Sequence, residues 1–148
     1  AFEGLINDYK SNMYRLALGI LQNQYDAEDA VSEAVLKAYI NLDKLRSADK
    51  FKAWILQITA NEAKMIYKKQ KRHFFMERVE TRMPAFEADY HELWDVVMGL
   101  DGPYREVILL FYYERFSITE IARILQIREG TVKSRLARGR NKLKELLK

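Results

Sequence analysis

The chain has 148 residues, 49% of them apolar and 31% charged, so it can bury one core or two small ones. It contains no cysteine, which excludes disulfide bonds, a thiol nucleophile and thiolate metal ligands. No apolar run approaches the roughly 20 residues that span a bilayer, and no signal peptide is recognisable, so we expect a cytoplasmic protein without membrane insertion.

Charge is arranged in blocks along the chain, although the net value is only +4. Residues 1–62 carry a net charge of −2, and residues 63–82 carry +5. Residues 83–114 then carry −6, and residues 115–148 carry +7. Two basic blocks separated by an acidic one predict two separate surfaces for anionic partners.

Apolar residues recur at helical spacing through most of the chain, and no stretch alternates with the period of a strand. Helices are predicted at residues 3–22, 26–43, 51–72, 90–100, 103–114, 117–125 and 129–147. The fold class is therefore all-α. We expect two small helical domains, residues 1–72 and 92–148, joined by a linker at residues 73–91. This linker contains Pro84 and is acidic at Glu80, Glu87 and Asp89.

The second predicted helix has two distinct faces. Its inward stripe comprises Ala27, Val31, Ala34, Val35, Ala38 and Leu42. Its outward side combines Asp29 and Glu33 with Leu36 and Ile40. Aliphatic side chains beside carboxylates on an exposed face favour a partner helix over water, whereas simple amphipathic packing is the alternative interpretation.

The third predicted helix also separates apolar from polar residues. Its core stripe is predicted to contain Phe51, Trp54, Ile55, Ile58, Met65 and Ile66. The opposite face is predicted to contain Gln57, Ala60, Lys64, Tyr67, Lys68 and Lys71, with Asn61 at its border. Cationic, amide and aromatic groups together suit a single nucleic-acid strand. Glu62 falls on the apolar side, which the pattern does not explain.

Residues 117–147 indicate a helix, a tight turn and a second, basic helix. Ser117 and Glu120 have the spacing of a capping box. Gln126 occupies the turn position where glycine commonly supplies a left-handed conformation. A helix-turn-helix with the basic helix second is the usual arrangement for DNA recognition, whereas a plain helical hairpin is the alternative.

The last predicted helix contains no acidic residue between Glu129 and Glu145. Its inward stripe is predicted to comprise Val132, Leu136, Gly139 and Leu143, continued by Leu146 and Leu147. The opposite face carries Ser134, Ala137, Arg138 and Asn141, flanked by Lys133 and Arg135. Small and basic side chains on one face permit close approach to a DNA groove.

Three long motifs resemble one known family. The stretch "YREVILLFYYERFSITEIARILQIREGTVKSRLARGRNKLKELL" resembles domain 4 of the extracytoplasmic-function (ECF) bacterial sigma factors. The stretch "YDAEDAVSEAVLKAYINLDKL" resembles region 2.2 of that family, and "FKAWILQITANEAKMIYKKQKR" resembles its regions 2.3 and 2.4. Arg115 and Gln126 stand where the family often has glycine.

The resemblance implies an initiation factor that binds core RNA polymerase and promoter DNA and helps to open the promoter. It implies contacts with the polymerase at Asp29, Ser32, Glu33, Leu36 and Ile40. It implies contacts with the −10 element at Arg46, Ser47, Ala48, Asp49, Lys50, Gln57, Asn61, Lys64 and Lys68. It implies contacts with the −35 element at Thr131, Lys133, Ser134, Arg135, Ala137, Arg138, Arg140 and Asn141. An anti-sigma factor is a further implied partner, able to hold the protein at the membrane.

Two other classes of protein fit the sequence less well. A LuxR-type regulator has a similar helix-turn-helix, but it would bring an α/β receiver or ligand domain, and residues 1–72 predict no strands. An enzyme is disfavoured because His73 and His91 lack a nearby cluster of carboxylates or a second histidine at helical spacing. We therefore expect no catalytic residue, metal or cofactor.

Overall fold

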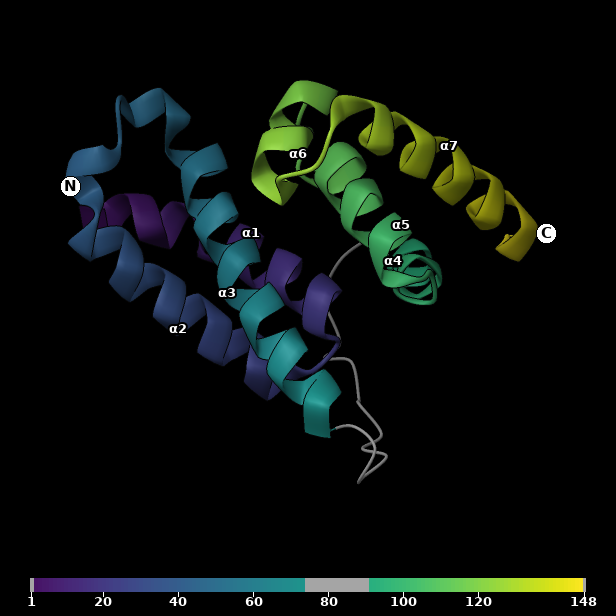
Figure 1. Ribbon diagram of the computed structural model, residues 1–148, viewed down its shortest axis with the longest axis horizontal. Coiled ribbons are helices and arrows are strands. Elements are labelled where there is room, and N and C mark those ends of the chain that lie inside the picture. The colour runs from purple at the N-terminus through teal and green to yellow at the C-terminus, as the bar shows by residue number, and fades with distance from the viewer. Residues whose placement is uncertain (1, 74–90, 148) are drawn as a thin grey trace. The chain divides into compact units, whose positions relative to one another are not determined.

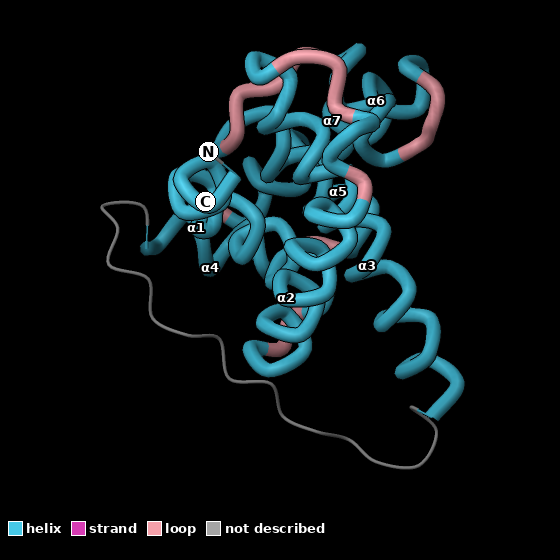
Figure 2. Tube along the Cα trace, turned by 90° about the vertical axis from the view of Figure 1, so that its left-hand side faces the viewer, coloured by secondary structure: helices cyan, strands magenta, loops and turns pink. Residues whose placement is uncertain are grey.

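The computed structural model describes residues 2–73 and 91–147, and these are helical almost throughout (Figures 1 and 2). The helices are α1 (Phe2–Leu21), α2 (Gln24–Ile40), α3 (Phe51–His73), α4 (His91–Met98), α5 (Gly102–Ile108), α6 (Ile118–Leu125) and α7 (Glu129–Leu146). Two 3₁₀ turns, η1 (Leu42–Lys44) and η2 (Ala48–Lys50), lie between α2 and α3, and a π turn, η3 (Leu109–Tyr113), continues α5. The all-α prediction is confirmed for the described residues, which contain no strand.

The chain divides into two compact units, residues 1–82 and residues 83–148. The first contains α1 to α3, and the second contains α4 to α7. The predicted linker, with its acidic Glu80, Glu87 and Asp89, lies outside the described residues except for its two ends, where α3 ends and α4 begins.

The N-terminal unit is a bundle in which α1, α2 and α3 all pack against one another. Asn23 caps the start of α2, and its side chain accepts a hydrogen bond from the backbone N–H of Asp26 at 3.1 Å. Its buried stripe consists mainly of alanines, which let neighbouring helices approach closely: Ala27, Ala30, Val31, Ala34 and Ala38. The predicted inward face of this helix is confirmed, although Val35 and Leu42 are only half-buried.

The predicted faces of α3 are partly wrong. Ala60, placed by the sequence on the polar face, is fully buried, and Met65, placed in the core, is exposed. The core face contains Phe51, Ile55, Leu56, Thr59, Ala60 and Ala63. Because both α1 and α2 pack against α3, its buried face is broader than a single apolar stripe and includes small residues at the contacts. Trp54 and Ile58 are half-buried at the edge of this face.

The C-terminal unit is built around α5 and α7, which pack against each other. Pro103 lies in the first turn of α5, where its missing N–H leaves no helical bond unmade. The buried Arg105 donates a hydrogen bond through Nη1 to the carbonyl of Leu100 at 2.7 Å, which closes the turn between α4 and α5. The rest of the core is mainly aliphatic and also contains the buried rings of Trp94 and Phe116; its aliphatic residues are Val97, Val107, Ile108, Leu109, Leu110, Ile121, Ile124, Leu125, Val132 and Leu136.

The predicted helix-turn-helix is present in α6 and α7. Both bonds of the Ser117–Glu120 capping box form, each at 3.1 Å, and they begin α6. Gln126 ends α6 in a left-handed conformation with φ 58° and ψ 47°. Arg115, the other residue expected to replace a glycine, has φ 60°.

Candidate nucleic-acid and protein-binding interfaces

Helix α7 exposes the face that its sequence predicts. Val132, Leu136 and Gly139 are buried against the rest of the C-terminal unit. The exposed side carries Lys133, Ser134, Ala137, Arg138, Arg140 and Asn141, while Thr131 and Arg135 are half-buried beside it. This surface combines cationic donors with two small side chains, so it can approach a phosphate backbone and the base edges between two strands.

The end of α7 differs from the prediction. Leu146 and Leu147 were expected to continue the buried stripe, but they are 55% and 58% exposed. The 18 residues of α7 extend about 27 Å, which is longer than the seven-residue α5 and its π turn can cover. The buried face of α7 therefore ends at Leu143, which is half-buried.

Helix α2 presents a mixed apolar and acidic surface to solvent. Asp29, Ser32, Glu33, Leu36 and Ile40 are all exposed, as predicted, with Leu36 at 54% and Ile40 at 68%. Sequence reasoning missed two exposed aromatic residues on the same helix, Tyr25 and Tyr39. Their spacing from the predicted residues could have indicated them, because Tyr25 lies one turn before Asp29. Exposed aliphatic and aromatic side chains edged by carboxylates form a surface suited to another protein.

The second half of the loop between α2 and α3 is exposed. Arg46, Ser47, Ala48, Asp49 and Lys50 are all exposed. The Ser47 hydroxyl donates a hydrogen bond to the Asp49 carboxylate. This bond, followed by one from the backbone N–H of Asp49, lowers the pKa of that carboxyl group. The Asp49 carboxylate therefore keeps its negative charge to a lower pH than an ordinary aspartate does.

A groove of about 580 Å³ runs between α2 and α3. It is lined by Lys37, Asn41, Lys44, Trp54, Gln57, Ile58, Asn61, Glu62 and Met65. Among the predicted −10 residues, Gln57 and Asn61 lie in this groove. Lys64, half-buried, and Lys68, exposed, lie farther along α3. The apolar walls and the amide side chains give the groove both stacking surface and hydrogen-bonding groups.

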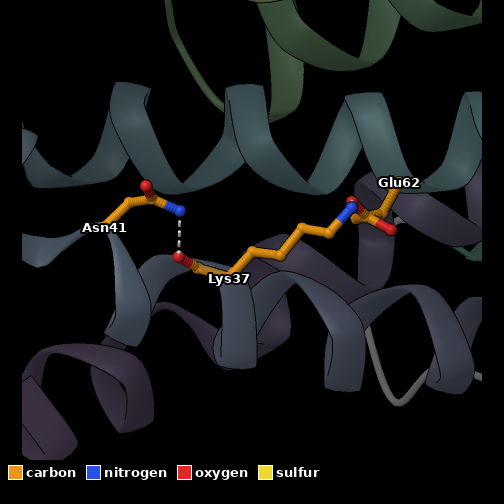
Figure 3. A network of polar contacts seen from close by, with 3 residues as sticks. All are labelled: Lys37, Asn41 and Glu62. Atoms are coloured by element: carbon orange, nitrogen blue, oxygen red, sulfur yellow. Dashed lines mark hydrogen bonds and ion pairs between the residues drawn. The ribbon is translucent and has the colours of Figure 1, made fainter.

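An ion pair between α2 and α3 accounts for the buried Glu62. Lys37 reaches across from α2 to the Glu62 carboxylate, whose side chain is only 7% exposed (Figure 3). The hydrogen bond with Glu62 raises the pKa of Lys37 above the ordinary lysine value. The Asn41 amide donates to the Lys37 carbonyl at 2.8 Å and so closes the end of α2 beside the pair. A charge on the apolar side of α3 is therefore neutralised by a partner from the neighbouring helix.

Comparisons with known proteins agree with this arrangement. The family model described as "Sigma-70 region 2" matches residues 5–73, and "Sigma-70, region 4" matches residues 90–143. The ECF RNA polymerase sigma factor SigW of Bacillus subtilis is 31% identical, over all of this chain and 89% of SigW. The RNA polymerase sigma factor SigV of the same organism is 33% identical, over 90% of this chain and 82% of SigV.

The chain belongs to the ECF sigma factors. A solved structure of the sigma factor RpoE from Bartonella quintana, in complex with the anti-sigma factor NepR, has the same fold. It superposes with a TM-score of 0.82 at 28% identity and covers 99% of this chain and 96% of RpoE. The resemblance inferred from the sequence is thereby confirmed.

The two family matches assign the helices of this sigma factor to its two conserved regions. Region 2 covers α1 to α3 almost completely, and region 4 covers α4 to α7 up to Leu143. The match of residues 5–73 to region 2 decides against the LuxR-type interpretation, which required an α/β domain there. The protein is thus an alternative sigma factor with a helix-turn-helix in region 4.

The sigma factor also contains a contact that sequence reasoning missed. Arg140 of α7, predicted to meet DNA, donates a hydrogen bond from Nε to the hydroxyl of Tyr112 at 2.6 Å. The contact joins α7 to the π turn. The only hint of this contact in the sequence is the run of aromatic residues at 111–113.

The described parts of the sigma factor contain no group of three or more histidine, aspartate or glutamate side chains placed to hold a metal ion. In those same residues, no helix is both long and apolar enough to cross a bilayer.

Proposed function

We propose that this sigma factor joins core RNA polymerase through α2, reads the −35 element with α7, and captures the opened −10 element with the loop and groove beside α3. The observation that carries the proposal is the pairing, in one chain, of an exposed apolar–acidic face on α2 with an exposed basic face on α7. A DNA-binding regulator that acts alone needs only the second of these faces.

The −35 element is bound by the exposed face of α7. Ser134 and Arg138 lie opposite the buried Val132 and Leu136, so they enter the major groove and reach base edges, with Lys133 beside them. Arg135 and Arg140 lie on the flanks and meet phosphates. Thr131, Ala137 and Asn141 complete the contact surface, and Ala137 keeps the helix close to the bases.

The −10 element is bound as an open strand. The exposed loop of residues 46–50 receives an unstacked base, because extracting a base requires a pocket rather than a helix in a groove. Gln57 and Asn61 offer amide groups within the groove, and Lys64 and Lys68 extend the cationic track along α3. Preferential binding of unpaired bases supplies the free energy for promoter opening.

Core polymerase is bound by Asp29, Ser32, Glu33, Leu36 and Ile40. The aliphatic pair supplies buried area, and the carboxylates give the contact its charge specificity.

The protein performs no covalent chemistry and needs no cofactor. It acts in the cytoplasm. As in the Bartonella quintana RpoE–NepR complex, an anti-sigma factor binds it. Such a partner can hold the sigma factor at the membrane.

Charge reversal on α2 tests the proposal. Asp29→Lys with Glu33→Lys is expected to weaken binding of the full chain to core polymerase at least tenfold, because unlike charges become like charges at the interface. The matched control is Asp8→Lys with Glu3→Lys, which makes the same charge change on exposed positions of α1. Equal affinities of both double variants for core polymerase, measured by fluorescence titration, would refute the assignment of the α2 face.

A further inference from the structure

Arg140 is held by an aromatic pair on the neighbouring π turn. Its Nε donates to the Tyr112 hydroxyl at 2.6 Å. Its guanidinium carbon lies 5.7 Å from the ring centre of Phe111 and 5.9 Å from that of Tyr112. The two rings themselves meet edge to face, with centres 4.9 Å apart. The guanidinium is therefore restrained by one hydrogen bond and two cation–π contacts.

The backbone on both sides of this contact is fixed. Gly139, the residue before Arg140, is buried, and a Cβ atom there would lie 3.1 Å from Cγ1 of Ile108. Tyr112 lies in the π turn, which closes with a hydrogen bond from the Glu114 N–H to the Leu109 carbonyl at 3.0 Å. Single π turns within α-helical segments often occur at functional sites.

The contact leaves the phosphate-binding end of the arginine available. A guanidinium has five N–H donors, and the Nε–H that Tyr112 accepts is the one nearest the backbone. The donors on Nη1 and Nη2 remain to meet a phosphate in the fork geometry that arginine provides. Both Arg140 and Tyr112 are exposed, so a DNA backbone can reach the pair.

From this geometry we propose that Tyr112 is a positioning residue that orients Arg140 for a phosphate of the DNA backbone. The inference rests on the proposed role of α7 at the −35 element and deepens it. A free arginine side chain loses rotamer freedom when it binds, whereas one already held by Tyr112 loses less. Tyr112 thus strengthens DNA binding without touching DNA, and it does so equally for every sequence.

A double-mutant cycle in the full chain tests this proposal. Holoenzyme reconstituted with wild type, Tyr112→Phe, Arg140→Ala or the double variant is titrated onto promoter fragments with matched and mismatched −35 sites over a range of salt concentrations. Tyr112→Phe keeps the ring, removes the hydroxyl, and is expected to weaken binding about 2- to 10-fold on both fragments with an unchanged salt slope. Arg140→Ala is expected to reduce the salt slope by about one. In the Arg140→Ala background, Tyr112→Phe is expected to have no further effect.

The matched control is Tyr104→Phe. Tyr104 also faces α7 and carries the Lys142 ammonium 5.2 Å from its ring centre, a contact that survives loss of the hydroxyl. This variant is expected to bind both fragments like wild type.

Three results would overturn the positioning role: tighter binding by Tyr112→Phe, a loss that persists in the Arg140→Ala background, or no loss at all. The first would mean that Tyr112 holds Arg140 away from DNA, and the second that the contact only braces the fold. An unchanged salt slope in Arg140→Ala is a different failure. It would remove the phosphate contact from the proposed function, and the positioning role with it.

Discussion

Gln126, in the turn of the helix-turn-helix, adopts a backbone conformation that glycine adopts more readily than other residues. Its φ of 58° is compatible with a side chain only at a cost of about 1 kcal/mol. Arg115, at φ 60°, and Gln22, at φ 54°, share this strain. At Gln126 the sequence already indicated a left-handed turn, because glycine commonly supplies that conformation at this turn position.

Replacing Gln126 by glycine is expected to stabilise the C-terminal unit by about 1 kcal/mol, because glycine adopts positive φ without steric strain. Urea unfolding of the full chain measures this when Trp94 fluorescence is followed in a Trp54→Phe background, since each unit contains one of the two tryptophans. The matched control is Arg123→Gly on the exposed side of α6, which should destabilise by about 1 kcal/mol. Equal shifts of both variants in the same direction would contradict the account.

The Lys37–Glu62 pair couples α2 to α3. Lys37→Met is expected to destabilise the N-terminal unit because it leaves the buried Glu62 carboxylate without its cation. Lys37→Met should lower the free energy of unfolding less in a Glu62→Gln background, because no buried carboxylate is then left unpaired. Since the pair raises the pKa of Lys37, its contribution is complete below the ordinary lysine pKa and disappears as pH rises through the raised value. Urea unfolding of the four proteins at neutral pH measures the coupling, and strictly additive losses would argue against it.

At the scale of elements, the sequence predicted the buried face of α7 better than that of α3. Helix α7 has one broad buried stripe, so period 3.6 predicted Val132, Leu136 and Gly139. Helix α3 packs against two helices, and its small residues could not reveal which side they bury. The sequence therefore misplaced Ala60.

The groove shows the same limit of sequence reasoning. Its lining combines α2 with α3, and Lys37 meets Glu62 only through tertiary packing. Asn61 and Gln57 were predicted from the face of one helix, whereas the residues of α2 opposite them had no signal in the linear pattern. The contact between Tyr112 and Arg140, 28 positions apart, escaped prediction for the same reason.

The close approach of α5 and α7 depends on Gly139. A Cβ atom at this position would lie 3.1 Å from Ile108 Cγ1 and 3.6 Å from Tyr104 Cβ, so a larger side chain overpacks the contact. Gly139→Leu is expected to destabilise the C-terminal unit by about 1 to 3 kcal/mol. Gly130→Leu is the control, because a Cβ atom there meets nothing within 4 Å. Thermal unfolding compares the two, and an unchanged midpoint for Gly139→Leu would show that the helices separate at little cost.

At the scale of the whole molecule, the two surfaces that we propose to read DNA belong to different units of one chain. The exposed loop of residues 46–50 lies in the first unit, and the basic face of α7 lies in the second. The acidic linker, residues 73–91, was predicted to join them. Separate units allow each promoter element to be read by its own set of side chains.

This separation predicts independent changes of specificity. Arg138→Ala is expected to reduce the difference in binding free energy between preferred and mismatched −35 sites by about 1 to 3 kcal/mol. The preference for the −10 element is expected to stay unchanged. Substitutions at Asn61 or in residues 46–50 are expected to change the −10 preference alone. Selection from a promoter library by each variant holoenzyme measures both elements at once. A shift of the upstream element by the loop variants would show that the two sites are wrongly assigned.

The most direct test of the central claim is transcription from a randomised promoter library by core RNA polymerase with and without this protein. We expect transcripts with defined start sites only when both are present, and we expect the selected promoters to share two separate elements, one near −35 and one near −10. Transcripts selected for a single element, or initiation that is indifferent to the protein, would contradict its function as a sigma factor.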